Sequence, residues 1–276
     1  MTLVALTVRV PPARREALAE WLVGLTGQAV EERPDGTVIA YVDDADAARV
    51  EAAVATRECD GVTIARAVAE PVDWVTRWRE GIGARSVGRV FLRPSWVSDV
   101  PAPGQVVLAL DPESAFGSGE HGSTRGALAL LDRRMGPGAR VLDLGSGSGI
   151  LAIAAALLGA ARAVGIELDY DAVPVAERNA AKNGVSDRVV FLHGDAGRLA
   201  PLGAPADVVC SNILRTINVS LLPAIAGALA PGGVAIFAGM EEPEEALFRP
   251  VLEGGGWTVV DEVRDDGWWS VAARRA

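Results

Sequence analysis

The fold of this 276-residue chain is decided by the nine residues Val141-Leu142-Asp143-Leu144-Gly145-Ser146-Gly147-Ser148-Gly149. The apolar residues at the start of this stretch predict a buried strand, and the alternating glycines predict a tight turn. The apolar run Ile150–Leu158 that follows predicts a helix. Glycines at alternate positions let backbone N–H groups approach a ligand that a side chain would push away. This order of strand, glycine turn and helix is typical of a nucleotide-binding, doubly wound α/β sheet.

The spacing of the glycines distinguishes between two nucleotide ligands. The pattern is G-x-G-x-G, and Ile150 stands where a dinucleotide-binding turn has its third glycine. This difference favours S-adenosyl-L-methionine as the cofactor, although an NAD-dependent dehydrogenase stays as an alternative. We expect Asp143, Gly145 and Gly147 to contribute to the cofactor site. A turn that only connects a strand to a helix would have the same composition.

Two further predicted strands end in carboxylates. Glu167 closes the short apolar strand that follows the predicted helix. An acid at the tip of the second strand of such a sheet accepts hydrogen bonds from both ribose hydroxyls. Asp195 follows the predicted strand Val189–Leu192 and could accept a hydrogen bond from the adenine amino group, while the backbone N–H of Ala196 could donate to the ring. The alternative is that either carboxylate is only solvated.

An asparagine follows the fourth predicted strand, within the apolar run Ala206–Leu214. In an open parallel sheet, ligands bind at the carboxyl ends of the strands, where Asn212 stands. Its amide oxygen could accept an N–H of an amine nucleophile and leave the nitrogen lone pair directed at a methyl group. We therefore predict Asn212 as a catalytic and cofactor-binding residue. A local asparagine turn is the alternative.

The composition limits the compartment and the partners. The sequence has no 20-residue apolar span, so we predict no membrane helix. Met1–Val10 lacks the features of a signal peptide. Two cysteines without ligand spacing indicate a cytoplasmic protein with free thiols, and two histidines exclude a histidine-rich metal site. The net charge of −10 argues against direct nucleic-acid binding and suits a basic protein partner. Solubility alone would also account for this charge.

The chain is predicted to have three parts. Residues 1–68 have the β-α-β-β-α-β order of a small α+β, ferredoxin-like domain, which we interpret as a substrate-recognition platform or a stabilising cap. Residues 69–87 are predicted as a linker helix, with Trp74 and Trp78 on one face, and a hinge at Gly81 and Gly83. Residues 88–276 form the predicted cofactor-binding domain.

A long glycine-rich loop, Asp111–Arg125, precedes the predicted helix Gly126–Arg134. Loops of this length inside a compact domain are usually functional. Phe116 is an apolar side chain among glycines, and Thr124 lies close to the predicted start of the helix.

The same loop is similar to the signature D-P-x-x-A-F-G-T-G-x-H-x-T-T-R of the bacterial ribosomal protein L11 methyltransferases (PrmA). The stretch Val141–Gly149 resembles the V-L-D-L-G-T-G-S-G of that family, and Asp207–Leu214 resembles its strand ending in A-N-I/L. Asp73–Trp78 and Asp266–Ala272 are similar to its linker and its closing strand. The resemblance is strong from residue 73 onward and weak over the first 66 residues.

The resemblance implies a Rossmann-like class I methyltransferase domain with a mostly parallel seven-stranded sheet. It implies cofactor contacts at Thr124, Gly145, Glu167 and Asn212, and we add Phe116 and Gly117 of the loop, which would close over the cofactor. Glu167 replaces the usual aspartate of the family, and serines at 118 and 123 replace threonines. His121 could relay a proton as a catalytic residue or only stabilise the loop.

The implied reaction is methyl transfer to lysine ε-amines, and to an α-amine, of ribosomal protein L11, with S-adenosyl-L-homocysteine as product. We expect the target to be free of the ribosome and the enzyme to be a monomer away from membranes. One alternative is a methyltransferase acting on another protein or a small molecule. Another is a binding module that holds the cofactor without turnover.

Overall fold

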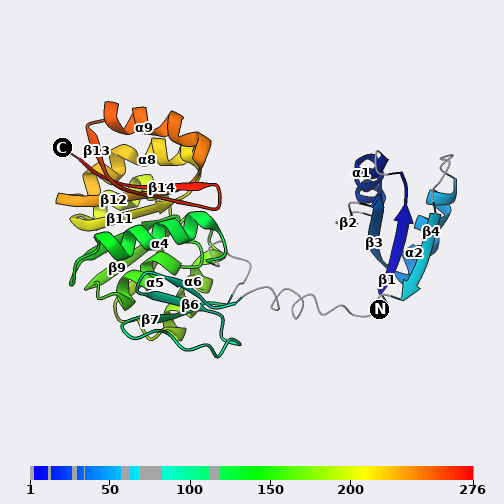
Figure 1. Ribbon diagram of the computed structural model, residues 1–276, viewed down its shortest axis with the longest axis horizontal. Helices are drawn as coiled ribbons and strands as arrows, with labels where there is room; N and C mark the ends of the chain where they lie inside the picture. Colours follow the sequence, from blue (N-terminus) through cyan, green and yellow to red (C-terminus); the bar gives the residue numbers. More distant parts are fainter. Residues whose placement is uncertain are drawn as a thin grey trace. The chain divides into compact units, whose positions relative to one another are not determined.

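The computed structural model describes residues 3–11, 14–26, 30–33, 35–56, 63–68, 83–111 and 119–275. The chain divides into two compact units, Met1–Gly81 and Ile82–Ala276 (Figure 1). The predictions made for Trp74, Trp78, Gly81, Phe116 and Gly117 lie outside the described residues.

The first unit has the predicted β-α-β-β-α-β order. Its elements are β1 (Leu3–Arg9), α1 (Arg15–Thr26), β2 (Val30–Glu32), β3 (Thr37–Asp43), α2 (Asp44–Ala55) and β4 (Thr63–Val68). The strands form an antiparallel sheet in the order β2-β3-β1-β4, which confirms the ferredoxin-like arrangement. Alternate residues of β1, such as Leu6 and Val8, pack against Leu22 of α1 and Val50 of α2 in one apolar core.

The second unit is built on a seven-stranded sheet in the order β10-β9-β8-β11-β12-β14-β13. The five strands from β10 to β12 are parallel. β14 is antiparallel to β12, and β13 is antiparallel to β14, so β13 again runs in the direction of the first five strands. The strands are β8 (Arg140–Leu144), β9 (Arg162–Glu167), β10 (Val189–His193), β11 (Ala206–Asn212), β12 (Leu229–Glu241), β13 (Trp257–Asp265) and β14 (Trp268–Arg275). This confirms the predicted Rossmann-like, mostly parallel sheet.

Helices cover both faces of this sheet (Figure 1). They are α4 (Gly122–Arg134), α5 (Ile150–Leu157), α6 (Ala172–Lys182), α7 (Ala196–Leu199), α8 (Arg215–Ala228) and α9 (Glu245–Gly254), with the short 3-10 turns η2 (Ala200–Gly203) and η3 (Glu242–Glu244). Successive residues of β8 belong to different cores: Val141 packs with α4 and α5, and Leu142 packs with α8. Burial on both faces explains why these strands are continuous apolar runs in the sequence.

The strand order reverses direction at β8. The chain runs outward from β8 through β9 to β10 on one side, and through β11 to β12 on the other. The connections after β8 and β11 therefore diverge and leave a crevice at the carboxyl ends of the strands.

A separate three-stranded sheet in the order β5-β6-β7 precedes the main sheet in the chain. It consists of β5 (Arg85–Val87), β6 (Val90–Arg93) and β7 (Val106–Ala109). The prediction placed residues 85–87 in the hinge, but they pair with β6 in an antiparallel ladder. The pattern missed β5 because three residues are too few to show an alternation.

The start of α4 differs from the prediction. The helix begins at Gly122, four residues before the predicted Gly126, because the carbonyl of His121 accepts from the N–H groups of Thr124 and Arg125 at 3.0 and 3.2 Å. The end of the glycine-rich loop is thus the first helical turn. The N-cap residue of α6 is Asp171.

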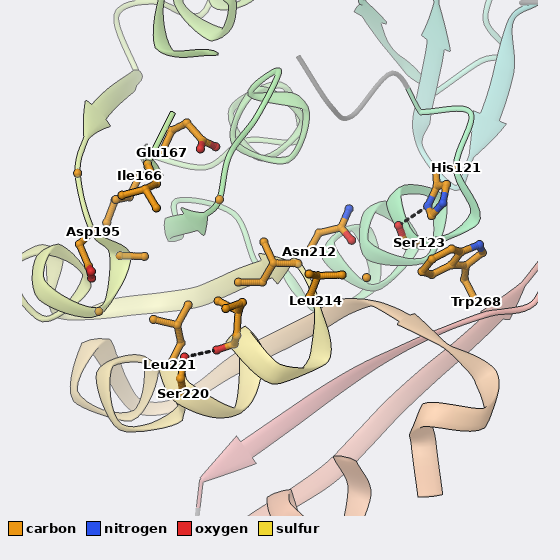
Figure 2. A pocket seen from close by; sticks show the side chains of 18 residues that line it. His121, Ser123, Ile166, Glu167, Asp195, Asn212, Leu214, Ser220, Leu221 and Trp268 are labelled. Atoms are coloured by element: carbon orange, nitrogen blue, oxygen red, sulfur yellow. Dashed lines mark hydrogen bonds between the residues drawn. The ribbon is translucent and has the colours of Figure 1, made fainter. Parts of the chain in front are cut away.

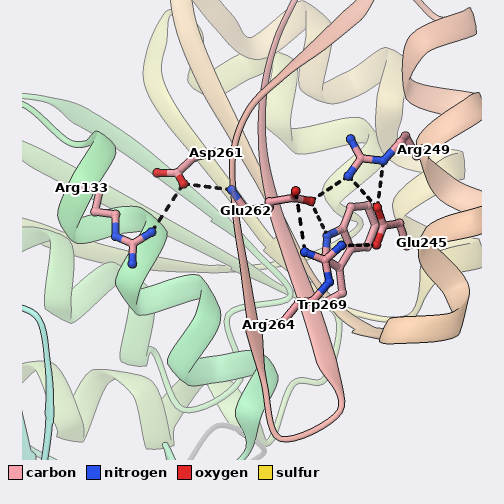
Figure 3. A network of polar contacts seen from close by, with 7 residues as sticks. All are labelled: Arg133, Glu245, Arg249, Asp261, Glu262, Arg264 and Trp269. Carbon is pink, nitrogen blue, oxygen red and sulfur yellow. Dashed lines mark hydrogen bonds and ion pairs between the residues drawn. The ribbon is translucent and has the colours of Figure 1, made fainter.

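A charged network holds the edge of the main sheet against α9 (Figure 3). The guanidinium of Arg249 lies 2.6 Å from Glu245 and 2.7 Å from Glu262, and Trp269 donates its indole N–H to Glu262 at 3.0 Å. Trp269 is buried on the α9 side of β14. Because neighbouring strand residues point to opposite faces, Trp268 is directed to the other face of the sheet.

In the part of the chain that the structure describes, no helix is long and apolar enough to span a membrane.

Candidate active site

A cavity of about 850 Å³ opens at the carboxyl ends of the parallel strands (Figure 2). Its wall includes six of the residues predicted for the site: His121, Gly145, Glu167, Asp195, Ala196 and Asn212. Glu167 and Asp195 lie toward one end, His121 and Trp268 lie toward the other, and Asn212 lies between them (Figure 2). The cavity therefore has an acidic end and an aromatic end.

Three other predicted cofactor residues do not line this cavity. Thr124 and Asp143 are fully buried behind its wall, and Gly147 donates its backbone N–H to Glu167. Thr124 contacts the side chain of Asn212. The remaining two, Phe116 and Gly117, lie outside the described part of the chain.

The glycine turn bends across the end of β9. The N–H groups of Gly145 and Ser146 donate to the carbonyl of Ile166 at 2.8 and 3.2 Å. Gly145 has a φ of +70°, which side chains rarely adopt, and a Cβ there would lie 2.6 Å from Cγ2 of Ile213. A residue with a side chain would thus strain the turn and push into the loop after β11.

The carboxylate of Glu167 joins this turn to the start of the next loop. Its Oε2 accepts from the N–H of Gly147 at 2.7 Å, and its Oε1 accepts from the N–H of Asp169 at 2.9 Å. An ionised carboxylate oxygen can accept a further hydrogen bond. Glu167 can therefore hold the turn and still accept hydroxyl donors from a ligand in the cavity.

Asp195 is the N-cap of the short helix α7. Its Oδ1 accepts from the N–H of Arg198 at 3.2 Å, which gives this carboxylate a structural role that the sequence analysis did not include. Ala196, the first residue of α7, also lines the cavity. The capping bond uses one of the two carboxylate oxygens, so the arrangement is compatible with a polar ligand at this end.

Asn212 carries the most informative polar atom of the site. Its Nδ2 donates to Oγ1 of Thr124 at 3.2 Å, which directs its Oδ1 away from α4. This Oδ1 is buried and has no hydrogen-bond partner within the described ranges. Leaving a buried acceptor unpaired costs about 1–3 kcal/mol. Such an atom beside a cavity indicates a ligand that brings a donor to it.

The other end of the cavity is aromatic. The rings of His121 and Trp268 pack with their centroids 4.0 Å apart, and Nδ1 of His121 lies 2.7 Å from Oγ of Ser123. Burial lowers the pKa of His121, and the nearby positive charge of Arg125 adds to this effect, whereas Asp266 opposes it. The imidazole is therefore neutral at neutral pH and able to accept a proton.

Much of the cavity wall is apolar and was not predicted from the sequence. Trp268 reaches the cavity from β14, which is the last strand in the sequence. Leu168 follows Glu167, and Leu214 and Ile217 come from the start of α8. The exposed fractions of these three side chains are 71%, 70% and 47%, although they are apolar. In the sequence, the signal that could have predicted this part of the wall was the presence of apolar residues after the strand ends.

Asp143 is completely buried beneath the glycine turn. Its Oδ2 accepts from the N–H of Ala152 in α5 at 3.2 Å. Burial is the main cause that raises the pKa of Asp143 to about 7; the hydrogen bond from Ala152 opposes the shift, and the charge of Glu167 adds to it. This carboxyl connects the end of β8 to α5, which explains its position behind the wall.

Comparisons with known proteins agree with this geometry. A model of the family described as ribosomal protein L11 methyltransferase (PrmA) matches residues 14–276. The ribosomal protein L11 methyltransferase of Geobacter metallireducens is 33% identical over 97% of this chain and 96% of the relative. That of Syntrophotalea carbinolica is 42% identical over 71% of this chain, and the aligned part spans 64% of the relative's own length.

A solved structure is also similar. The ribosomal protein L11 methylase of Lactobacillus delbrueckii subsp. bulgaricus matches with a TM-score of 0.64 and 29% identity, over 70% of this chain and 98% of the other. The strand order, the glycine turn and the acid at the tip of β9 define a class I methyltransferase fold. Within that class, the chain belongs to the ribosomal protein L11 methyltransferase family.

Replacement of Asp143 by asparagine should change the pH dependence of stability. The pKa of Asp143 is higher in the folded chain than the ordinary value of 3.8, so the unfolded chain loses this proton first as the pH rises. Ionisation of Asp143 therefore opposes folding progressively between about pH 4 and pH 7. The stability of Asp143→Asn relative to wild type should rise by about 2–3 kcal/mol between pH 5 and pH 8.

Urea denaturation at pH 5, 6, 7 and 8 measures this difference. Asp187→Asn is the matched control, because the Asp187 side chain is 75% exposed. We expect its stability difference from wild type to stay constant over the same range. A constant difference for Asp143→Asn as well would show that the carboxyl is not held in its neutral form.

Proposed function

We propose that this chain transfers methyl groups from S-adenosyl-L-methionine to lysine ε-amines, and to the α-amine, of ribosomal protein L11. The observation that carries the proposal is the buried, unpaired Oδ1 of Asn212 on the wall of the cavity, at the end of β11. The family of the chain supports the choice of reaction and target.

The residues of the cavity fit the cofactor. Its volume of about 850 Å³ lies within the range of small-molecule sites. Gly145 lines the cavity without a side chain, and the carboxylate of Glu167 stands at the strand tip where ribose hydroxyls bind in doubly wound sheets. Asp195 and the N–H of Ala196 would face the adenine. When bound, the sulfonium of S-adenosylmethionine supplies an already activated methyl group.

The role of the protein in the reaction is then to align the acceptor amine. We assign Oδ1 of Asn212 to accept one N–H of the attacking nitrogen, which orients its lone pair toward the methyl group. Alignment of this kind can lower the barrier by several kcal/mol, up to about 7–11 kcal/mol in ideal cases. The contact with Thr124 holds the Asn212 amide in this orientation.

The amine must also lose a proton before it attacks. A free lysine has a pKa of about 10.4, and transfer into a closed apolar pocket disfavours its charged form. The apolar wall at Leu214 and Trp268 supports such desolvation. The neutral His121 at the same end could accept the proton, and its contact with Ser123 fits a purely structural role equally well.

Target recognition is assigned to residues 1–68, with residues 69–87 as the linker to the methyltransferase domain, residues 88–276. The register of β1 with β3 places Ala5 opposite Tyr41 and Thr7 opposite Ile39, on the sheet face away from the two helices. We assign this face to contact with the target protein. The net charge of −10 supports a basic protein target over a nucleic acid. We propose that the enzyme acts as a monomer in the cytoplasm on L11 free of the ribosome.

Incubation with methyl-labelled cofactor tests the reaction and its target. Separated large-subunit ribosomal proteins serve as acceptors, and we expect the label in L11. Asn212→Ala should lower kcat on the order of 100-fold because the amine loses its alignment. Label in another protein but not in L11 would contradict the target. Unchanged turnover of Asn212→Ala would remove this residue from the mechanism.

Calorimetric titration with S-adenosyl-L-homocysteine tests the ribose assignment. Glu167→Ala should weaken binding by about 10–100-fold, because hydrogen bonds to a charged group are worth about 1.5–3 kcal/mol. Glu167→Asp keeps the carboxylate and should retain most of the affinity. Glu177→Ala, which removes an exposed acid of α6, is the control for net charge. Equal affinities of Glu167→Ala and wild type would refute the assignment.

A further inference from the structure

Asn218 is a completely buried amide in the second turn of α8, and the structure gives it an unusual set of partners. Its Oδ1 accepts from Oγ of Ser211 at 2.7 Å. Its Nδ2 donates to the carbonyl of Ile213 at 2.9 Å and to the carbonyl of Ala238 at 3.0 Å. Two of these three partners are the chain neighbours of Asn212.

The residues on both sides of Asn212 are thus tied to one side chain, Ser211 through its hydroxyl and Ile213 through its carbonyl. Ser211 is buried on β11, one residue before Asn212, and Ile213 is the first residue after the strand. The N–H of Ile213 donates to the carbonyl of Ala238 in β12 at 3.2 Å, so this carbonyl accepts from both Ile213 and Asn218. The end of β11 therefore cannot rotate without breaking several buried hydrogen bonds.

Packing alone does not require these polar groups. A buried amide and a buried hydroxyl are costly unless both are satisfied, and an apolar pair of similar size would fill the same space. The polar pair is useful here because the carbonyls of Ile213 and Ala238 lie where β11 ends. The bonds from Asn218 fix the direction in which the next side chain, that of Asn212, leaves the backbone.

We propose that Asn218 is a positioning residue for the methyl transfer, acting through Ser211 and Ile213 to hold Oδ1 of Asn212 on the wall of the cavity. This inference rests on the proposed function. Asn218 is completely buried and does not line the cavity, so it acts on the acceptor amine only through Asn212. Glu167 and Asp195, assigned to the nucleoside, are carried by β9 and the loop after β10, which Asn218 does not contact through a hydrogen bond. Its loss should thus affect alignment far more than cofactor affinity.

A double-mutant cycle tests the proposal. Asn218→Ala is made in the wild type and in Asn212→Ala, and kcat for methyl transfer to L11 is compared with the affinity for S-adenosyl-L-homocysteine. We expect kcat to fall by about 10–100-fold in the wild-type background while the affinity changes less than about threefold. In the Asn212→Ala background, Asn218→Ala should have no further effect on kcat, because the residue acts through Asn212.

Asn183 offers a matched control. Its side chain also clamps backbone groups: Nδ2 donates to the carbonyls of Ala109 and Asn179, both at 2.8 Å, and Oδ1 accepts from the N–H of Ala109 at 2.8 Å. This clamp joins β7 to α6 and lies outside the cavity wall. Asn183→Ala should lower the melting temperature and leave kcat within about twofold of wild type.

Two further measurements keep the proposal open to refutation. If Asn218→Ala does not fold, Ser211→Ala removes only the bond between Ser211 and Asn218, and should lower kcat by about fivefold, as for one hydrogen bond. The side-chain amide signals of Asn212 in an NMR spectrum report its environment without any acceptor protein. They should shift in Asn218→Ala, or in Ser211→Ala where that variant replaces it, and stay in place in Asn183→Ala.

An unchanged kcat would overturn the proposal, as would an equal fall of kcat in both backgrounds. Unshifted Asn212 signals would overturn it as well. A wild-type protein that methylates no L11 would contradict the proposed function instead, and the NMR comparison would still decide whether Asn218 positions Asn212.

Discussion

The hydrogen bonds between the glycine turn and the end of β9 are the constraint on which the rest of the site depends. Gly145 and Ser146 donate to the carbonyl of Ile166, and Gly147 donates to the carboxylate of Glu167. These bonds bend the chain over the neighbouring strand before α5 begins. They leave space above β8 and bring an acid to the border of that space. Only glycine accepts the required backbone conformation at Gly145 without a collision.

Two buried polar side chains, those of Asp143 and Asn218, hold other strand ends of the site in place. Asp143 joins the end of β8 to α5 through its bond from Ala152. Its raised pKa of about 7 reflects the unfavourable burial of an ionised carboxylate at this position. Asn218 joins the end of β11 to α8 and β12. Both lie behind the cavity wall, and both act on residues that form it. The site is therefore positioned from the core, where packing leaves little freedom.

The site residues at the strand ends could be predicted from the sequence, because each is marked by a pattern of neighbouring residues. The residues Gly145, Glu167, Asp195 and Asn212 each follow an apolar run, and the carboxyl ends of parallel strands meet at one edge. Trp268 could not be predicted in this way, since it reaches the cavity through the long-range antiparallel pairing of β14 with β12. Thr124 was predicted from the family resemblance as a cofactor contact, whereas its hydroxyl contacts Asn212. A strand of three residues, such as β5, shows no pattern before its partner is known.

We infer that the carboxyl edge of this sheet holds S-adenosylmethionine between the glycine turn and Asn212. A crystal structure of the chain with S-adenosyl-L-homocysteine tests it most directly. We expect the ribose hydroxyls on the carboxylate of Glu167, the adenine beside Ala196, and the sulfur facing Asn212. A nucleoside bound away from the ends of β8 and β9, or a cavity that stays empty at saturating ligand, would contradict it.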